Sequence, residues 1–388
     1  MTESRPPDTP AGAAQPGAER TERLSARLRE LELDALLVAT AADLRYLTGF
    51  TGSNGLALVA ARGTGVFAAH RFLTDFRYAT QSAEQVPPAY EREIVSGDLF
   101  EAAGSLLAGA AGGLGDARGR LGFDDTTLTV RSHRRVGEHA GEKWELVPCS
   151  GELARLSAVK DGGELARIRA AAELADRALS EVIEGGLAGR GEREVAVEIG
   201  ERLRRLGAEG PSFDAIVAGG AHAALPHAQP RDVEIERNVL VTIDWGALLD
   251  GYCSDCTRTF ATGEGISTRE REVYAVVLEA QQAGLEALRV GISGREADAA
   301  AREVIERAGL GEYFGHGLGH GVGLEIHEGP RLARKEADAT LQAGNVVTVE
   351  PGVYIPGEFG VRIEDLVALG EGSSEIFTGL SKELIVIE

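Results

Sequence analysis

Cysteines, long apolar runs and signal-peptide features are scarce in this sequence, and each scarcity excludes a class of protein. Only three of its 388 residues are cysteines, Cys149, Cys253 and Cys256, which is too few for a disulfide framework and typical of a reducing compartment. No uncharged apolar run reaches the ~18–20 residues of a membrane-spanning helix, and residues 1–20 contain four prolines and no apolar signal-peptide core. We therefore expect a cytoplasmic protein that neither crosses a membrane nor is exported.

Basic residues are also outnumbered: 40 lysines and arginines face 61 aspartates and glutamates, a net charge of −21. Such a balance repels phosphate backbones and anionic lipid surfaces, so nucleic acids and membranes are poor partner candidates. What the chain does have is 43% apolar and 26% charged residues, close to the average of globular proteins, so most of it can bury a core. At about 150 residues per domain, this length suggests two domains.

Residues 1–20 lack a periodic apolar face and are rich in proline, alanine and glycine, so we expect a disordered tail. The next segment, residues 21–154, predicts a first domain of α/β type that opens with an amphipathic helix near Glu22. The strands expected after it are 34–40, 55–61, 64–69, 90–96, 120–125 and 143–148, with helices at 99–109 and 126–138.

A second domain, residues 155–388, is predicted to be α+β. It opens with a long helical pattern that places Leu165, Ile168, Ala172, Leu179 and Val182 on one face. The elements expected after it are helix 192–206, strand 213–218, a two-strand block at 239–262, helices 268–289 and 295–308, and strands 345–354 and 360–369. The polar residues capable of chemistry concentrate in these strands and in the loops between them.

The block VTIDWGALLDGYCSDCTRTF predicts a β-hairpin whose turn carries Asp250 and Gly251. That register sets Asp255 opposite Gly246, with Asp244 two residues away on the same side of the sheet, so both carboxylates can reach a common ion. Two aspartates in apolar strands are costly to bury without a cation. The alternative is that they are solvated or cap a neighbouring segment. The two cysteines of this block fall on opposite faces of the strand and do not predict a zinc or redox site.

Five of the eight histidines lie between residues 222 and 327, and three of them stand in the glycine-rich block GHGLGHGVGLEIHEGP. These three are His316, His320 and His327, and the glycines allow the backbone to approach a ligand or a metal closely. The alternative is a flexible loop with incidental histidines. The block cannot stay helical, so the spacing of His316 and His320 does not predict a helical zinc site.

The block NVVTVEPGVYIPGEFGVRIEDLVAL places Glu350 at the end of one apolar run and Glu364 inside a second one. Each run would bury a carboxylate in a sheet, which calls for a positive counter-charge. The alternative for Glu364 is a salt bridge to Arg362.

Four carboxylates and one imidazole from these blocks would balance two divalent cations: Asp244, Asp255, Glu350, Glu364 and His320. An oxygen-rich set with one nitrogen suits manganese, cobalt, iron or zinc, and is less typical of magnesium. Two ions ~3.5–4 Å apart can hold a bridging hydroxide at neutral pH and polarise a carbonyl, as in two-metal aminopeptidases. We expect two divalent ions, manganese first.

The order IDWGALLDGYCSDCTRTF, GHGLGHGVGLEIHE, TVEPGVY and VRIED resembles the pita-bread metallopeptidases, the group of methionine aminopeptidase, aminopeptidase P and prolidase. This resemblance spans about residues 155–388. The segments LRYLTGFTGSNG and TDFRYATQ resemble the creatinase-type N-terminal domain of aminopeptidase P and prolidase, which narrows the choice to the proline-directed branch. The resemblance implies a pita-bread catalytic domain preceded by a smaller α/β creatinase-type domain.

The resemblance also implies a role for each matching ligand. Asp244 corresponds to a ligand of one metal, Asp255 and Glu364 to the two bridging carboxylates, and His320 with Glu350 to the ligands of the other metal. Glu350 further corresponds to the residue that relays a proton from the nucleophilic water.

On the substrate side, the resemblance assigns His227 to the neighbourhood of the substrate amine and the scissile peptide. It assigns His316 and His327 to orienting the substrate carbonyl and stabilising the tetrahedral intermediate. Arg362 would steady the bridging carboxylate from behind, and His222 matches no functional position and is expected to be structural.

The activity expected is that of an Xaa-Pro aminopeptidase acting on short peptides with proline at the second position. Three alternatives remain: a prolidase that cleaves only Xaa-Pro dipeptides, a metal-free creatinase-like amidinohydrolase, and a non-catalytic binding module. The intact ligand set speaks against the last two. Arg331 is relevant to the prolidase alternative, because a dipeptidase needs a cation that binds the carboxylate after proline. An aminopeptidase must instead leave that end of the pocket open. The resemblance also implies a homodimer or homotetramer.

Overall fold

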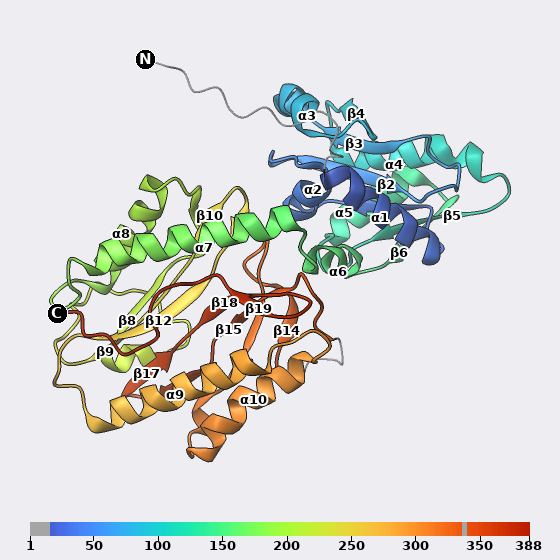
Figure 1. Ribbon diagram of the computed structural model, residues 1–388. Coiled ribbons are helices and arrows are strands. Elements are labelled where there is room, and N and C mark those ends of the chain that lie inside the picture. Colours follow the sequence, from blue (N-terminus) through green and yellow to red (C-terminus); the bar gives the residue numbers. More distant parts are fainter. Residues whose placement is uncertain (1–15, 336–339) are drawn as a thin grey trace. The chain divides into compact units, whose positions relative to one another are not determined.

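The computed structural model describes residues 16–335 and 340–388. The chain divides into two compact units, Met1–Leu156 and Ser157–Glu388, coloured blue to teal and green to red in Figure 1. The predicted tail lies outside the described residues as far as residue 15. Residues 16–20 begin helix α1 (Pro16–Glu30), so the expectation of disorder is wrong for them.

The first unit is of α/β type, as predicted, and holds a six-stranded sheet in the order β4-β3-β2-β1-β5-β6. Its strands are β1 (Ala35–Val38), β2 (Gly55–Ala60), β3 (His70–Thr74), β4 (Tyr90–Ile94), β5 (Gly119–Phe123) and β6 (Trp144–Pro148). Its other helices are α2 (Ala41–Thr48), α3 (Ala79–Gln85), α4 (Leu99–Ala110), α5 (Val130–Ala140) and α6 (Glu152–Ala158), with short turns η1 (Phe76–Tyr78) and η2 (Ala111–Leu114). β1, β5 and β6 run parallel to one another.

Helices α4 and α5 cover one face of this sheet, where Leu107 and Val136 are completely buried. The strand expected at 64–69 does not form. Gly63 and Gly65 adopt left-handed conformations, with φ of 78° and 73°, and these turn the chain before β3 begins. The prediction from apolar runs alone therefore gave one strand too many in this region.

The second unit is α+β, as predicted. Its helices are α7 (Gly162–Ile183), α8 (Glu192–Arg205), α9 (Thr268–Ala287) and α10 (Gly294–Arg307), with short turns η3 (Gly220–Ala224) and η4 (Gly311–Tyr313). Its strands are β7 (Gly210–Pro211), β8 (Ile216–Gly219), β9 (Leu240–Trp245), β10 (Ala247–Leu249), β11 (Tyr252–Cys253), β12 (Cys256–Ala261), β13 (Gly319–Gly321), β14 (Glu328–Leu332), β15 (Val346–Val349), β16 (Gly352–Ile355), β17 (Phe359–Arg362), β18 (Asp365–Leu369) and β19 (Ser374–Ile376). Within the described ranges these strands form sheets ordered β11-β10-β7, β12-β9-β8, β14-β13-β15-β18-β19 and β16-β17.

Two pairs of helices cover opposite sides of these sheets, α7 with α8 and α9 with α10 (Figure 1). One core joins α7 and α8 to β8, β9 and β10 around Trp245, and the other joins α9 and α10 to β15, β16 and β17 around Val277. The face predicted for α7 is buried at Ile168, Ala172, Leu179 and Val182 and partly buried at Leu165. None of the helices in the described parts of the chain is long and apolar enough to cross a bilayer.

Each of the two C-terminal strands predicted from the sequence is interrupted, and a glutamate stands at each interruption. The run 345–354 divides into β15 and β16 at Pro351, which has no N–H to donate to a sheet ladder. Glu350 precedes that proline. The run 360–369 divides into β17 and β18 at Glu364, whose N–H donates to the carbonyl of Thr257 at 3.1 Å. Both glutamates therefore stand at strand ends.

Candidate metal centre

The first part of the site is the hairpin, and it has the register that the sequence predicts. Leu249 pairs with Tyr252, which leaves Asp250 and Gly251 as a two-residue turn with φ of 47° and 76°. Positive φ at both positions is the signature of a type I′ turn. The flanking pairs, Leu248 with Cys253 in β10–β11 and Trp245 with Cys256 in β9–β12, leave Asp255 opposite Gly246.

Gly246 is needed for this close approach, because a Cβ there would lie 1.9 Å from the carbonyl oxygen of Ser254. The two cysteines of the hairpin are free thiols. Their sulfur atoms contact different carbonyls, those of Leu324 and Glu364, rather than each other.

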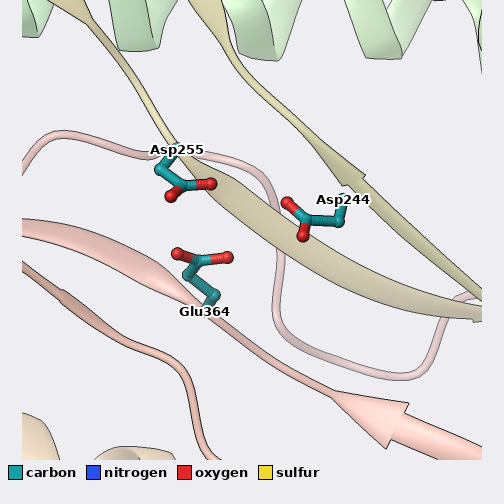
Figure 2. A group of neighbouring side chains, drawn as sticks. All are labelled: Asp244, Asp255 and Glu364. Carbon is teal, nitrogen blue, oxygen red and sulfur yellow. The ribbon is translucent and has the colours of Figure 1, made fainter. Parts of the chain in front are cut away.

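Three carboxylates meet where the hairpin approaches the end of β17. Asp244 comes from β9, Asp255 from the loop between β11 and β12, and Glu364 from the break between β17 and β18. One oxygen from each lies within 4.8 Å of the other two, and Figure 2 shows the three groups turned toward one another. Three like charges at this spacing, two of them buried, repel one another, so the cluster calls for a cation.

The hydrogen bonds of these carboxylates leave room for that cation. Arg362 donates from Nη2 to Oδ2 of Asp244 at 2.7 Å, and Thr257 donates from its hydroxyl to Oε2 of Glu364 at 2.6 Å. The second oxygens, Oδ1 of Asp244 and Oε1 of Glu364, are buried and have no hydrogen-bond partner among the described residues. Buried oxygens without donors are the atoms that a metal ion would satisfy, so the residues present suit a divalent cation.

His320 and Glu350 complete the set of five residues that the sequence singled out. Nε2 of His320 lies 3.6 Å from Oδ2 of Asp255 and 3.3 Å from Oε1 of Glu350. Its Nδ1 lies 3.0 Å from the carbonyl of Gly321, which can only accept, so the proton is on Nδ1 and the lone pair of Nε2 faces the carboxylates. This is the arrangement of a metal-binding histidine, held from behind by a backbone carbonyl.

Burial dominates the electrostatics of the metal-free site. Burial together with the charges of Glu364 and Asp244 raises the pKa of Asp255 well above its usual range, and burial together with Glu350 and Asp244 does the same for Glu364. Burial lowers the pKa of His320, so its imidazole is neutral at neutral pH. A bound cation reverses this balance by stabilising the ionised carboxylates.

The four remaining sequence candidates line the same cavity. His227, His316, His327 and Arg331 share with the carboxylates a cavity of about 1030 Å³ in the second unit. The ring of His327 lies 4.4 Å, centre to centre, from that of His320. His222 lies outside this lining and bonds to Glu192 through Nδ1 at 2.9 Å, in keeping with a structural role.

Arg362 does not contact the carboxylate that the sequence analysis gave it. Its ion pair is with Asp244, and it reaches Glu364 only through the hydroxyl of Thr257, to which its Nε donates at 2.9 Å. Arg362 ends β17, and this strand contacts β9, which carries Asp244. The expected pairing with the bridging carboxylate is therefore corrected to Asp244.

Tyr354 is a site residue that sequence reasoning missed. Its buried hydroxyl accepts from Nη1 of Arg362 at 2.9 Å and lies 3.0 Å from Nε2 of His316. Because Nδ1 of His316 lies 2.7 Å from the carbonyl of Gly317, that nitrogen carries the proton, and Tyr354 donates to Nε2. A hydrogen-bonded chain thus runs from Asp244 through Arg362 and Tyr354 to His316.

We expect the stabilisation by a divalent cation to grow with pH. In the metal-free protein, the raised pKa values of Asp255 and Glu364 favour the folded state most below their unfolded pKa, about 4, and this contribution is lost as the pH rises through the folded pKa. The cation binds the ionised carboxylates, so its affinity rises with pH. Calorimetry at about pH 5 and about pH 7.5 should show the larger Tm difference between manganese-loaded and chelator-treated protein at the higher pH. An equal difference at both would contradict this charge balance.

Comparisons with known proteins agree with this geometry. The Creatinase/Prolidase N-terminal domain model matches residues 20–159, and the Metallopeptidase family M24 model matches residues 166–371. The Xaa-Pro dipeptidase of Pyrococcus furiosus is 35% identical over 367 residues, 95% of this chain and 99% of that protein.

Two solved structures extend the likeness to the fold. An Xaa-Pro dipeptidase from Bacillus anthracis has a TM-score of 0.88 at 39% identity, over 95% of this chain and 99% of that chain. An X-Pro aminopeptidase from Thermotoga maritima has a TM-score of 0.82 at 35% identity, over 93% of this chain and 100% of that chain. With a creatinase-type N-terminal unit, a pita-bread catalytic unit and a carboxylate cluster suited to metal, this chain is an enzyme of metallopeptidase family M24.

Proposed function

We propose that this protein is a metal-dependent Xaa-Pro dipeptidase. From the sequence we expected an Xaa-Pro aminopeptidase, with the dipeptidase as the alternative. The similar proteins from Pyrococcus furiosus and Bacillus anthracis, both described as Xaa-Pro dipeptidases, favour the alternative. The proposed substrates are dipeptides with proline at the second position.

Five residues would hold two divalent cations, namely Asp244, Asp255, His320, Glu350 and Glu364. When bound, such ions supply Lewis acidity toward the scissile carbonyl and lower the pKa of water. Manganese remains our first choice, with cobalt, zinc or iron as alternatives for an oxygen-rich set with one imidazole.

The chain's own side chains would perform the proton and substrate steps. Burial raises the pKa of Glu350, which suits a carboxylate that takes a proton from the attacking water and passes it to the leaving nitrogen. His327 makes no hydrogen bond to another described residue, so it is available to donate to the substrate carbonyl as charge develops there. His227, exposed on the same cavity, would act near the substrate amine.

The observation that carries the dipeptidase proposal is the state of Arg331. Its guanidinium lines the cavity, is exposed, and forms no ion pair with any residue in the described ranges. Arg204 also lines the cavity and forms no ion pair with a described residue, but Arg331 lies close enough to His320 and His327 to lower their pKa. We therefore assign the incoming carboxylate to Arg331. A free carboxylate directly after proline exists only in an Xaa-Pro dipeptide.

The size of the cavity favours the Xaa-Pro aminopeptidase as the second candidate. A cavity of about 1030 Å³ lies at the upper end of the range for small-ligand sites, roughly 300–1,000 Å³. It would accommodate residues beyond proline if no other group closed it.

A panel of substrates, tested on the wild type and on two arginine variants, separates dipeptidase from aminopeptidase activity. We expect rapid cleavage of an Xaa-Pro dipeptide and little of the matching Xaa-Pro-Xaa tripeptide or Xaa-Pro amide. Arg331→Ala should raise the KM for the dipeptide by roughly 10- to 100-fold, because it removes a hydrogen bond to a charged group. The control is Arg334→Ala, whose exposed side chain pairs with Glu306 away from the cavity. Equal cleavage of dipeptide and tripeptide would make the protein an aminopeptidase.

The cytoplasmic location and the homodimer or homotetramer remain proposals made from the sequence. Light scattering of the purified protein would give the number of chains in the assembly.

A further inference from the structure

The strand that carries the substrate-facing residues has two chemically different sides. His327, Arg331 and Ala333 line the cavity, whereas Glu328 and Leu332, which alternate with them, are absent from its lining. His327 immediately precedes β14, Arg331 stands within it and Ala333 follows it, while Glu328 and Leu332 at the two ends of the strand point away from the cavity. Glu328 therefore lies behind the strand, between the two residues proposed to act on substrate.

Glu328 is held there by a buried ion pair with Lys160. The side chains of the lysine and the glutamate are only 1% and 12% exposed. Glu328 also accepts a hydrogen bond from the backbone N–H of Glu325, inside the loop that leads to His327. The carboxylate lies so close to Gly323 that a Cβ there would be 2.3 Å from its Oε1. The carboxylate of Glu328 thus contacts both the loop before His327 and the residue that pairs with it, Lys160.

The backbone around Lys160 is held in place by hydrogen bonds on both sides. Its backbone N–H donates to the carbonyl of Gly344 at 2.8 Å, just before β15. The next residue, Asp161, forms the capping box of α7 with Glu164. The ammonium group therefore connects the start of the long helix to the back of β14, across 168 residues of sequence.

We propose that the Lys160–Glu328 ion pair is a positioning device that sets the placement of His327 and Arg331 over the metal centre, and thereby the selectivity for a free carboxylate after proline. This inference rests on the proposed dipeptidase function. A buried ion pair adds little stability over an apolar pair of the same size, but losing one partner leaves an unpaired charge. Such a pair is better suited to holding a defined geometry.

The test uses Lys160→Met, Glu328→Gln and the double variant in the full-length, manganese-loaded protein. We expect the KM for an Xaa-Pro dipeptide to rise by a factor on the order of 10 to 10², since a displacement of about 1 Å at a reacting site costs up to 10²-fold. The preference for the dipeptide over its amide should shrink, because Arg331 is displaced. Metal content by elemental analysis should remain that of the wild type.

The matched control is Arg169→Gln, which removes the exposed ion pair of Arg169 with Glu375 in the same unit and should change neither KM nor the preference. If a single variant fails to fold, the double variant, which leaves no unpaired buried charge, answers the question. A lower Tm with wild-type KM and wild-type preference would overturn the positioning role while leaving the dipeptidase function intact. Wild-type protein that cleaves no Xaa-Pro dipeptide would overturn both.

Discussion

Glu364→Gln is expected to reduce hydrolysis of an Xaa-Pro dipeptide by a factor on the order of 10³ and to lower the metal content of the purified protein. The substitution keeps the shape of the side chain and its hydrogen bond from Thr257, but removes the charge on the oxygen that has no partner in the described chain. A metal ion contributes several kcal/mol to such a reaction, and each 1.36 kcal/mol is tenfold in rate. Elemental analysis and initial rates measure the two effects separately.

Glu375→Gln is the matched control, since this exposed glutamate stands in the edge strand β19 of the sheet that contains β18, and its partner is an exposed arginine. It should retain wild-type metal and activity. Chelator should abolish activity in the wild type, and manganese or cobalt should restore it. Full peptidase activity in protein shown to be metal-free would refute the metal-dependent mechanism, and unchanged metal content in Glu364→Gln would remove that residue from the ligand set.

His327→Ala is expected to lower kcat by roughly 10²–10³, the usual cost of losing one donor that stabilises a developing oxyanion. His316→Ala should also lower kcat, because it removes the partner that holds the hydroxyl of Tyr354 in the cavity. Their metal content should stay at the wild-type level, because neither ring contributes to the carboxylate cluster. His227→Ala should lower kcat in the same sense. Pre-steady-state rates with an Xaa-Pro dipeptide would separate an effect on the chemical step from one on product release.

The control for the histidines is His139→Ala, an exposed position on α5 of the first unit. The effect of a further substitution at Tyr354 should distinguish His316→Ala from His327→Ala. His316 already shares its Nε2 with Tyr354, so Tyr354→Phe should reproduce part of the His316→Ala defect and leave His327 unaffected. Wild-type rates in all three histidine variants would mean that these side chains do not act on substrate.

Several of the proposed metal ligands could be predicted from the sequence because they carry a local signal. Asp250 and Gly251 specify a two-residue turn, and that turn alone sets Asp255 opposite Gly246. Glu350 and Glu364 interrupt apolar runs, where a carboxylate has no structural purpose. The partners behind them carry no such signal. Tyr354 and Lys160 are ordinary in their local sequence, and their partners His316 and Glu328 lie 38 and 168 residues away along the chain.

The same distinction applies to the fold. Capping boxes such as Ser267 with Glu270 and Ser293 with Glu296 mark the starts of α9 and α10, so these helices could be predicted to within a residue or two. The break before β18 was not predicted, since it depends on the hydrogen bond that Glu364 makes to Thr257, whereas Pro351 marks the break after β15 in the sequence itself. The partner of Arg362 was misjudged because it likewise depends on a residue distant in the sequence.

Because the turn between β10 and β11 has only two residues, the position of Asp255 depends more on the number of residues in this hairpin than on their identity. Side chains alternate between faces along a strand, so one residue inserted or deleted at Asp250 would rotate Asp255 to the opposite face of the sheet while Asp244 stayed in place. A gene with one extra codon there would still encode all five proposed ligands in their proper order. A sequence search that only checks for the presence of these residues would then classify such a chain as an enzyme, although it could no longer assemble its metal centre.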